Sequence, residues 1–288
     1  MGRADGALAR LNMAGWHALG EATRAERPRV PFAIGGRVVG SVDRSHLPAL
    51  RRFGDVLSVG DRVELHAADR VAAFAQLNAA LRAQGLIVAW RDETYPVPDP
   101  ESLEALATFE RASSRFWGTL TFGAHATGYV ADAAGRPRAL WIAQRSFTKA
   151  TDPGLFDNLI GGGVQHGQTP AETLVREGFE EAGLAPAQLA HARPGSVLRL
   201  ARDIPEGFQH EWLYSYDVAL PEGTAPQNQD GEVAGFSLLP VADALALAAG
   251  AKMTVDAALV TLDFALRHHL LDDPALVQGV QALRAHHP

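Results

Sequence analysis

The sequence predicts an α+β protein of two domains, a smaller N-terminal α+β domain over residues 1–110 and a larger sandwich of sheet and helices over residues 111–288. Three observations predict this organisation. The chain has 288 residues, about twice the size of a typical domain. Three prolines in the segment 95–100 fix the backbone and remove hydrogen-bond donors, which favours a connector. Beyond Phe116, strand-type and helix-type patterns alternate.

The N-terminal domain is expected to contain a helix, two strand-type segments and a second helix. The first helix is expected at residues 7–22, and the two strand-type segments at residues 31–42 and 56–65. Asp69 is a suitable cap for the second helix, which stops at Gly85. The apolar stripe that this helix is expected to bury consists of Val71, Phe74, Leu77 and Leu81.

The C-terminal domain is expected to alternate strands with helices. Its strand-type segments cover residues 117–130, 139–144, 212–218 and 232–239. A final helix begins after Thr254, with Ala258, Leu262 and Leu266 on one stripe. This order is typical of an α/β or α+β sandwich.

Composition excludes several classes of function. Lys and Arg number 26 against 33 Asp and Glu, and the net charge of -7 disfavours a nucleic-acid partner because no basic face is segregated. The absence of cysteine excludes disulfides, thiolate metal sites and cysteine nucleophiles. No apolar run approaches the roughly 20 residues of a membrane span, and no secretory signal pattern is present. We therefore expect a cytoplasmic protein without a membrane partner.

A glycine loop followed by a helix is the segment that carries chemistry. Thr169 is a good N-cap, Pro170 fits the first helical position, and Glu172 stands where a capping box needs it. Gly183 supplies a left-handed stop. The helix is therefore predicted over residues 170–182.

Three carboxylates share one face of this helix. At 100° per residue, Glu177, Glu180 and Glu181 fall within a 100° arc. The opposite face is predicted to be buried, and it consists of Ala171, Val175, Phe179 and Ala182. Clustered carboxylates suit Mg²⁺ or Mn²⁺, although a solvated acidic face is the alternative. Gly178 within the helix indicates close approach by another element.

The segment resembles the Nudix box, G-x5-E-x7-R-E-U-x-E-E-x-G-U, starting at Gly162. The matching residues are Arg176, Glu177, Glu180, Glu181, Gly183 and Leu184, whereas Gln168 and Gly178 depart from the pattern. The resemblance implies an α/β/α sandwich whose box acids, Glu177, Glu180 and Glu181, bind Mg²⁺ or Mn²⁺ with the Gly161 carbonyl. It further implies that Arg176 orients the acids and that Glu180 or Glu181 accepts a proton.

A second signature lies upstream, from Arg145 to Gly154. It resembles R-S-x-x-K-x-T-x-P-G of isopentenyl-diphosphate isomerases and of the Nudix half of certain fused thiamine pyrophosphokinases. The resemblance implies that Arg145 and Lys149 bind a diphosphate, with ordinary surface cations as the alternative. The isomerases need a cysteine where this chain has Gly161, which excludes isomerase activity. The thiamine-type resemblance covers nearly the whole chain, including an N-terminal module like the domain of unknown function DUF4743.

Three further groups of residues are candidates. Glu232 is a candidate metal ligand from a late loop, with Glu206 and Glu211 as competitors. Trp212 is a candidate for stacking on a substrate ring because it alternates with Tyr214 and Tyr216 on one strand face, although core packing is the alternative. The histidines at 125, 166 and 210 lack metal-ligand spacing and are expected to be structural.

The function implied is metal-dependent hydrolysis of a diphosphate linkage in a thiamine-diphosphate-like or nucleoside-diphosphate-like small molecule. The alternative from another class is a Nudix-fold module that senses such a ligand without cleaving it. A decapping role is disfavoured by the acidic balance. The N-terminal module is expected either to cover the substrate pocket or to support a homodimer.

Overall fold

The computed structural model describes residues 16–285. Its N-terminal part is a four-stranded sheet with the order β2-β1-β4-β3. These strands are β1 (Arg29–Ile34), β2 (Arg37–Asp43), β3 (Leu57–Val59) and β4 (Val63–Leu65). β1 and β2 form a hairpin because Gly35 and Gly36 turn the chain with φ values of 58° and 82°. Short helical turns link β2 to β3, namely α3 (Leu47–Leu50) and the 3-10 segments Arg44–His46 and Arg51–Phe53.

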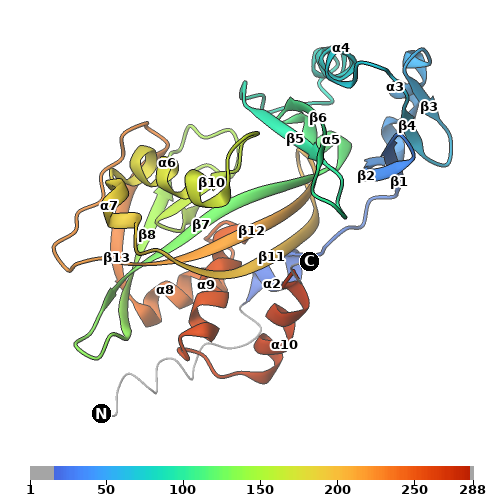
Figure 1. The fold of residues 1–288 in the computed structure, drawn as a ribbon. Coiled ribbons are helices and arrows are strands. Elements are labelled where there is room, and N and C mark those ends of the chain that lie inside the picture. The colour runs from blue at the N-terminus through green and yellow to red at the C-terminus, as the bar shows by residue number, and fades with distance from the viewer. Residues whose placement is uncertain (1–15, 286–288) are drawn as a thin grey trace.

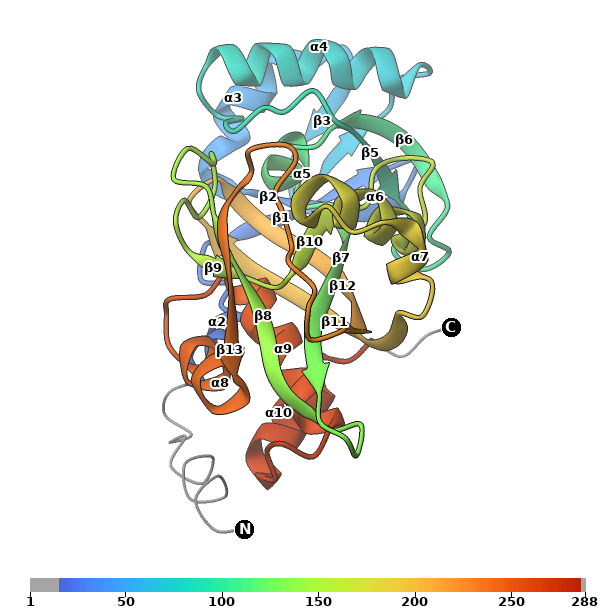
Figure 2. The ribbon, with the colours of Figure 1, turned by 90° about the vertical axis from the view of Figure 1, so that its left-hand side faces the viewer.

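Helix α4 (Arg70–Ala83) covers this sheet, as Figure 2 shows at the top of the molecule. The predicted cap is confirmed, since the Asp69 side chain accepts a hydrogen bond from the Ala72 amide. Phe74, Leu77 and Leu81 are buried as predicted. The expectation for Val71 is wrong, because its side chain is 52% exposed and lies off the buried face.

The segment predicted as a connector is a strand instead. β5 (Thr94–Pro98) pairs antiparallel with β6 (Ala105–Glu110) in a two-stranded sheet. Both strands of such a pair are edge strands, so the missing N–H groups of Pro96 and Pro98 leave pairing intact. Helix α5 (Ser113–Trp117) follows, and buried Trp117 donates a hydrogen bond to Asn78 of α4 over 2.8 Å.

A seven-stranded sheet forms the centre of the second part (Figure 1). Its main path has the order β11-β12-β7-β8-β13, while β10 pairs with β7 and β9 pairs with β8. The strands are β7 (Leu120–Ala131), β8 (Pro137–Arg145), β9 (Phe156–Asp157), β10 (Ile160–Gly163), β11 (Arg193–Ile204), β12 (Gly207–Ala219) and β13 (Val233–Pro240).

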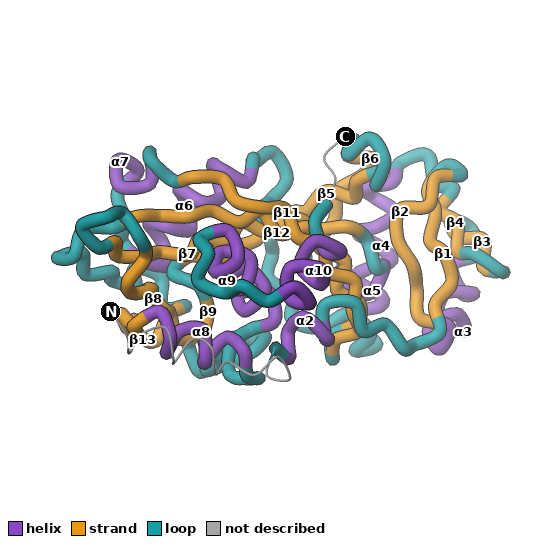
Figure 3. The backbone as a smooth tube through the Cα atoms, turned by 90° about the horizontal axis from the view of Figure 1, so that it is seen from below, coloured by secondary structure: helices purple, strands orange, loops and turns teal. Residues whose placement is uncertain are grey.

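Helices cover both faces of this sheet. Figure 1 shows α6 (Pro170–Ala182) and α7 (Pro186–Leu189) on one face, above β10. The other face carries α8 (Val241–Ala249), α9 (Val255–Arg267), α10 (Pro274–Leu283) and the short α2 (His17–Glu21), which Figure 3 shows from below. The predicted α/β/α sandwich with a C-terminal helical extension is therefore confirmed.

Several elements differ from expectation. The first predicted helix, residues 7–22, lies partly outside the described residues, and the described part is α2. Strand β11 and helices α8 and α10 were not predicted. The helix after Thr254 is confirmed, with Ala258 and Leu262 buried and Leu266 partly buried.

Packing crosses the predicted division at residue 110. Trp16, Ala18 and Ala22 join the buried cluster that α8 and α9 form under the large sheet. Phe116 and Trp117 belong to the N-terminal cluster instead. The two parts are therefore interlocked, and the boundary at 110 stays a prediction. No helix among residues 16–285 is long and apolar enough to cross a membrane.

Candidate active site

Helix α6 begins and ends where the sequence predicts. Thr169 accepts a hydrogen bond from the Glu172 amide, and the Glu172 carboxylate accepts one from the Thr169 amide, which completes the capping box. Gly183 ends the helix with φ at 64°. Local signals within the segment are thus sufficient to fix the limits of this helix.

The buried face of α6 differs from the prediction. Phe179 is 56% exposed and Ala171 is exposed, whereas Glu181 is only 6% exposed. The buried residues are Thr173, Leu174, Gly178, Glu181 and Ala182. The helix therefore turns part of its acidic face inward.

Glycines explain how carboxylates can occupy this interface. A Cβ atom on Gly162 of β10 would lie 2.1 Å from Oε1 of Glu177. A Cβ atom on Gly178 would lie 2.5 Å from Leu189 and 3.0 Å from Ile160, so the close approach expected there is confirmed. Since neither position carries a side chain, α6 packs directly on β10 and brings its acids against that strand.

Arg176 joins two of the acids. Its Nη2 lies 2.9 Å from Glu177 and its Nη1 lies 2.8 Å from Glu180. Its Nε donates to Gln168 over 3.3 Å, which ties the helix to the preceding loop. Glu180 is the most exposed of the three acids, with 42% of its side chain accessible.

Lys149 lies beside the third acid. Its Nζ is 3.6 Å from Glu181 and contacts Glu232, and the lysine side chain is buried. Lys149 is therefore brought to the acids of α6. Glu232 is linked to Glu181 only indirectly, because both side chains contact Lys149.

The electrostatics of the acids are unfavourable to their charged forms. Burial raises the pKa of Glu181 to about 8, with Glu177 adding to the shift and Lys149 opposing it. Burial also raises the pKa of Glu177, against the attraction of Arg176. Such raised values occur where buried carboxylates lie close together, and they mark candidate functional sites.

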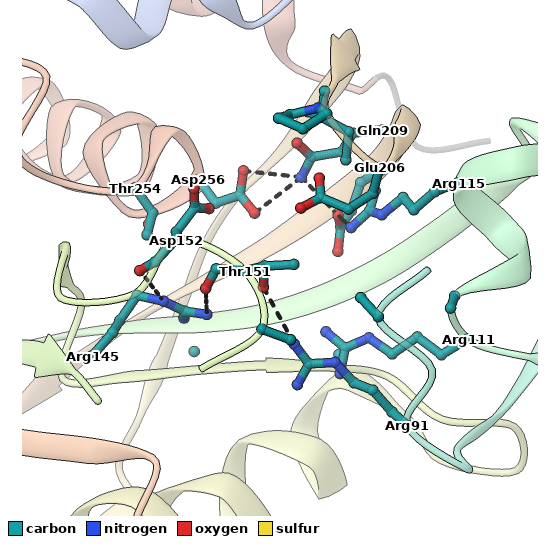
Figure 4. Close-up of a pocket in the computed structure, with 18 of the residues that line it drawn as sticks. Arg91, Arg111, Arg115, Arg145, Thr151, Asp152, Glu206, Gln209, Thr254 and Asp256 are labelled. Carbon is teal, nitrogen blue, oxygen red and sulfur yellow. Dashed lines mark hydrogen bonds and ion pairs between the residues drawn. The ribbon is translucent and has the colours of Figure 1, made fainter. Parts of the chain in front are cut away.

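A cavity of about 380 Å³ lies on the other side of β10, between the two parts of the chain (Figure 4). The glycine strand Gly161–Gly163 forms part of its wall. The charged residues that line it are Arg91, Arg111, Arg115, Arg145, Arg202, Asp152, Asp157, Glu206, Glu211 and Asp256. The acids of α6 do not line the cavity, but Gly162 in its wall lies next to the Glu177 side chain.

Two predicted substrate-binding residues, Arg145 and Trp212, differ in their position relative to the cavity. Arg145 lines the cavity, but Asp157 holds its Nη1 at 2.9 Å and the carbonyls of Thr151 and Asp152 accept from its other nitrogens. Trp212 does not line the cavity, and its ring lies against Phe122, with centroids 6.1 Å apart. Alternation along β12 explains this, because Glu211 faces the cavity and its neighbour must face the opposite side.

Sequence reasoning missed a buried polar cluster on the cavity wall. The side-chain amide of Gln209 donates to Glu211 over 2.9 Å and to Asp256 over 3.0 Å. The sequence indicates Glu211 only as an alternative to Glu232, and no sequence pattern indicates Asp256. His125, expected to be structural, also lines the cavity and pairs with Asn158 over 3.1 Å. Three separate segments supply these residues, so no local motif could indicate them.

The carboxylate groups of α6 are of the chemical type that binds a divalent cation. Glu177, Glu180 and Glu181 offer hard oxygen donors, and the charge of a cation would relieve the repulsion that raises their pKa values. In the conformation described, Arg176 and Lys149 occupy these oxygens. Accordingly, residues 16–285 contain no group of three His, Asp or Glu side chains placed to hold a metal ion.

Comparisons with known proteins match two regions of the chain to known families. Residues 121–258 match the NUDIX domain, and residues 14–121 match a domain of unknown function, DUF4743. Among solved structures, DR0079 from Deinococcus radiodurans is similar with a TM-score of 0.46 and 24% identity, covering 59% of this chain and 97% of that chain.

Two plant proteins are similar over most of the chain. Nudix hydrolase 20, chloroplastic, from Arabidopsis thaliana is 35% identical over 257 residues, which is 83% of this chain and 68% of that protein. Nudix hydrolase 24, chloroplastic, from the same plant is 34% identical over 266 residues, which is 88% of this chain and 72% of that protein. The cytoplasmic location expected for this chain stays a prediction, as does the thiamine-pyrophosphokinase-associated subgroup. This chain belongs to the Nudix hydrolases, a family of enzymes.

Proposed function

We propose that the chain hydrolyses a diphosphate linkage in a small molecule, with Mg²⁺ or Mn²⁺ as cofactor. One observation carries the proposal: the buried carboxylates of α6 lie against a glycine strand whose other side lines a cavity rich in arginine. The cavity volume of about 380 Å³ suits a compact ligand. The substrate class is a thiamine-diphosphate-like or nucleoside-diphosphate-like compound, as the sequence resemblance implies.

We assign the residues the roles that the sequence resemblance implies. Glu177, Glu180 and Glu181, with the Gly161 carbonyl, would hold the cation, which supplies polarisation of the phosphoryl oxygens. Glu181 accepts the proton of the attacking water, the role that the resemblance to the Nudix box implies for Glu180 or Glu181. Arg176 keeps Glu177 and Glu180 in place.

The reaction balances with water as the only co-reactant. Water oxygen forms a bond to one phosphorus while the bond from that phosphorus to the bridging oxygen breaks. The proton from water goes to Glu181, and the departing phosphate takes a proton from solvent. Lys149, adjacent to Glu181, compensates the growing negative charge.

Single Glu→Gln substitutions test the assignment. With Mg²⁺ and a panel of thiamine diphosphate, ADP, ADP-ribose and NADH, Glu181→Gln is expected to reduce turnover by about 10²- to 10⁴-fold, the usual contribution of general base catalysis. Glu177→Gln is expected to follow it, and Glu180→Gln to have the weakest effect because this acid is half exposed. Products are identified by mass spectrometry.

Glu101→Gln is the matched control, since this acid is exposed and remote in sequence from α6. It is expected to retain full turnover. If all three α6 variants cleave every compound at the rate of the unaltered protein, the assignment is wrong. Loss of turnover in a chelator, restored by Mg²⁺, tests the cofactor separately.

A diphosphate-sensing module is the second candidate. The ion pairs of Arg176 and Lys149 with the acids favour it, because they occupy the oxygens that a cation would need. Calorimetry would then detect tight binding of a diphosphate with Mg²⁺, while mass spectrometry would detect no cleaved product. Cleavage of any compound in the panel excludes this candidate.

A further inference from the structure

The N-terminal domain, taken here as the residues 14–121 that match DUF4743, contributes three arginines to the wall of the cavity. Arg91, Arg111 and Arg115 come from the segment around β5, β6 and α5, whereas β10 and β12 supply other parts of the wall. Figure 4 shows Arg91 and Arg111 extending side by side toward the cavity. A domain outside the sandwich therefore places cations beside the glycine strand.

Arg91 has no carboxylate partner among the described residues, although its side chain is largely buried. Its Nη2 donates to the Thr151 hydroxyl over 3.2 Å, and no acid within residues 16–285 lies within ion-pair distance of its guanidinium. Burial lowers the pKa of Arg91, and the charges of Arg111 and Arg145 lower it further, against the attraction of the more distant Glu93 and Glu232. Confining a cation among like charges is costly unless an anion compensates them.

Arg111 and Arg115 are held in place by single carboxylates. Glu93 lies 3.0 Å from Arg111, whose guanidinium is also 5.3 Å from the centre of the Tyr95 ring. Glu211 lies 3.1 Å from Nη2 of Arg115. Nη1 of Arg115 is buried and finds no hydrogen-bond partner in the described part of the chain. Within residues 16–285, each of these two arginines is therefore paired with one carboxylate.

We propose that Arg91, Arg111 and Arg115 form a binding subsite for a phosphoryl group of the substrate, so that the N-terminal domain is part of the active site. Guanidinium groups donate two parallel hydrogen bonds to phosphate oxygens, which suits them to this ligand. The subsite lies across the glycine strand from the acids of α6. One phosphoryl group of a diphosphate contacts the arginines, and the rest of the substrate extends along the glycine strand toward the acids of α6.

This inference rests on the proposed function for its ligand, but it is tested without catalysis. The probe is inorganic pyrophosphate, titrated by calorimetry into the full chain in a chelator. Arg91→Gln is the main variant because this side chain has no ion pair to break. It is expected to raise the Kd for pyrophosphate about tenfold or more, as loss of a hydrogen bond between charged groups does.

Two further variants make the test specific. Arg91→Lys keeps the charge and is expected to recover part of the affinity, but not all, because lysine lacks the planar fork. Arg52→Gln removes an exposed arginine of the same domain that does not line the cavity, and it is expected to leave the Kd unchanged. Circular dichroism checks that each variant is folded.

The outcomes separate this inference from the proposed function. Equal Kd values for Arg91→Gln and the unaltered chain overturn the subsite, as does failure of the unaltered chain to bind pyrophosphate, whatever the turnover of diphosphates. A loss of binding in Arg91→Gln supports the subsite even where no compound is cleaved. In that last case only the proposed function fails.

Discussion

Two clusters of buried charge lie on opposite faces of the large sheet, and their electrostatics are opposite. On the face covered by α9, Asp263 is fully buried and accepts hydrogen bonds from Ser196 over 2.7 Å, Arg267 over 2.7 Å and Arg284 over 2.8 Å. Burial opposes its ionisation, but Arg267 and the hydrogen bonds outweigh that cost and hold the pKa of Asp263 below its usual value.

On the face covered by α6, Glu181 is nearly as buried but poorly compensated. It accepts one hydrogen bond, from the Gly161 amide over 2.9 Å, and Lys149 stays 3.6 Å away. Glu177 adds repulsion, and the pKa of Glu181 rises to about 8.

The difference distinguishes a structural charge from a candidate functional one. A buried carboxylate with a structural role is surrounded by hydrogen-bond donors. A buried carboxylate that binds a cation or transfers a proton has fewer hydrogen-bond donors around it. The comparison predicts that removing the charge destabilises the protein strongly at Asp263 and only slightly at Glu181.

Asp263→Asn is expected to cause the largest loss of stability. It leaves Arg284 and one side of Arg267 without a charged partner, and breaking a buried pair typically costs about 3–5 kcal/mol. The free energy of unfolding from urea titration at pH 7 measures this loss. Asp272→Asn, at an exposed position, is the control and is expected to change stability by less than about 0.5 kcal/mol.

The pH dependence of stability tests the same charge with a smaller expected effect. Because the folded pKa of Asp263 is depressed, its contribution is complete above the unfolded pKa of about 3.9 and is lost as the pH falls through the lower folded pKa. The stability difference between the unaltered chain and Asp263→Asn is therefore expected to shrink below about pH 4. A constant difference between pH 7 and pH 2 would show that charge is not what Asp263 contributes.

Local signals in the sequence were enough to predict the ends of α6. Thr169, Glu172 and Gly183 act through hydrogen bonds and backbone angles within the segment itself. The buried face could not be predicted in this way, because it depends on what packs against the helix. Hydrophobicity alone would bury Phe179, yet β10 has no side chains at 161–163 and accepts the acidic side of α6 instead.

The residues of the cavity could not be predicted from local patterns either, because they are far apart in the sequence. Arg91 and Asp256 both line the cavity although they are 165 positions apart in the sequence, and neither belongs to a motif. Pro96 and Pro98 indicated a connector because prolines usually interrupt sheets. Their place in a two-stranded sheet depends on pairing with β6, which a local pattern does not specify.

Glu181→Gln is expected to have the smallest effect on stability, and this makes it the sharpest test of the comparison. Measured by urea titration in a chelator at pH 7, the free energy of unfolding should fall by no more than about 0.5 kcal/mol. The glutamine oxygen can still accept the hydrogen bond from Gly161, Lys149 keeps Glu232, and the repulsion from Glu177 disappears. A loss of several kcal/mol, like that expected for Asp263→Asn, would mean that Glu181 serves mainly as the buried partner of Lys149. The contrast between the two faces of the sheet would then have no functional meaning.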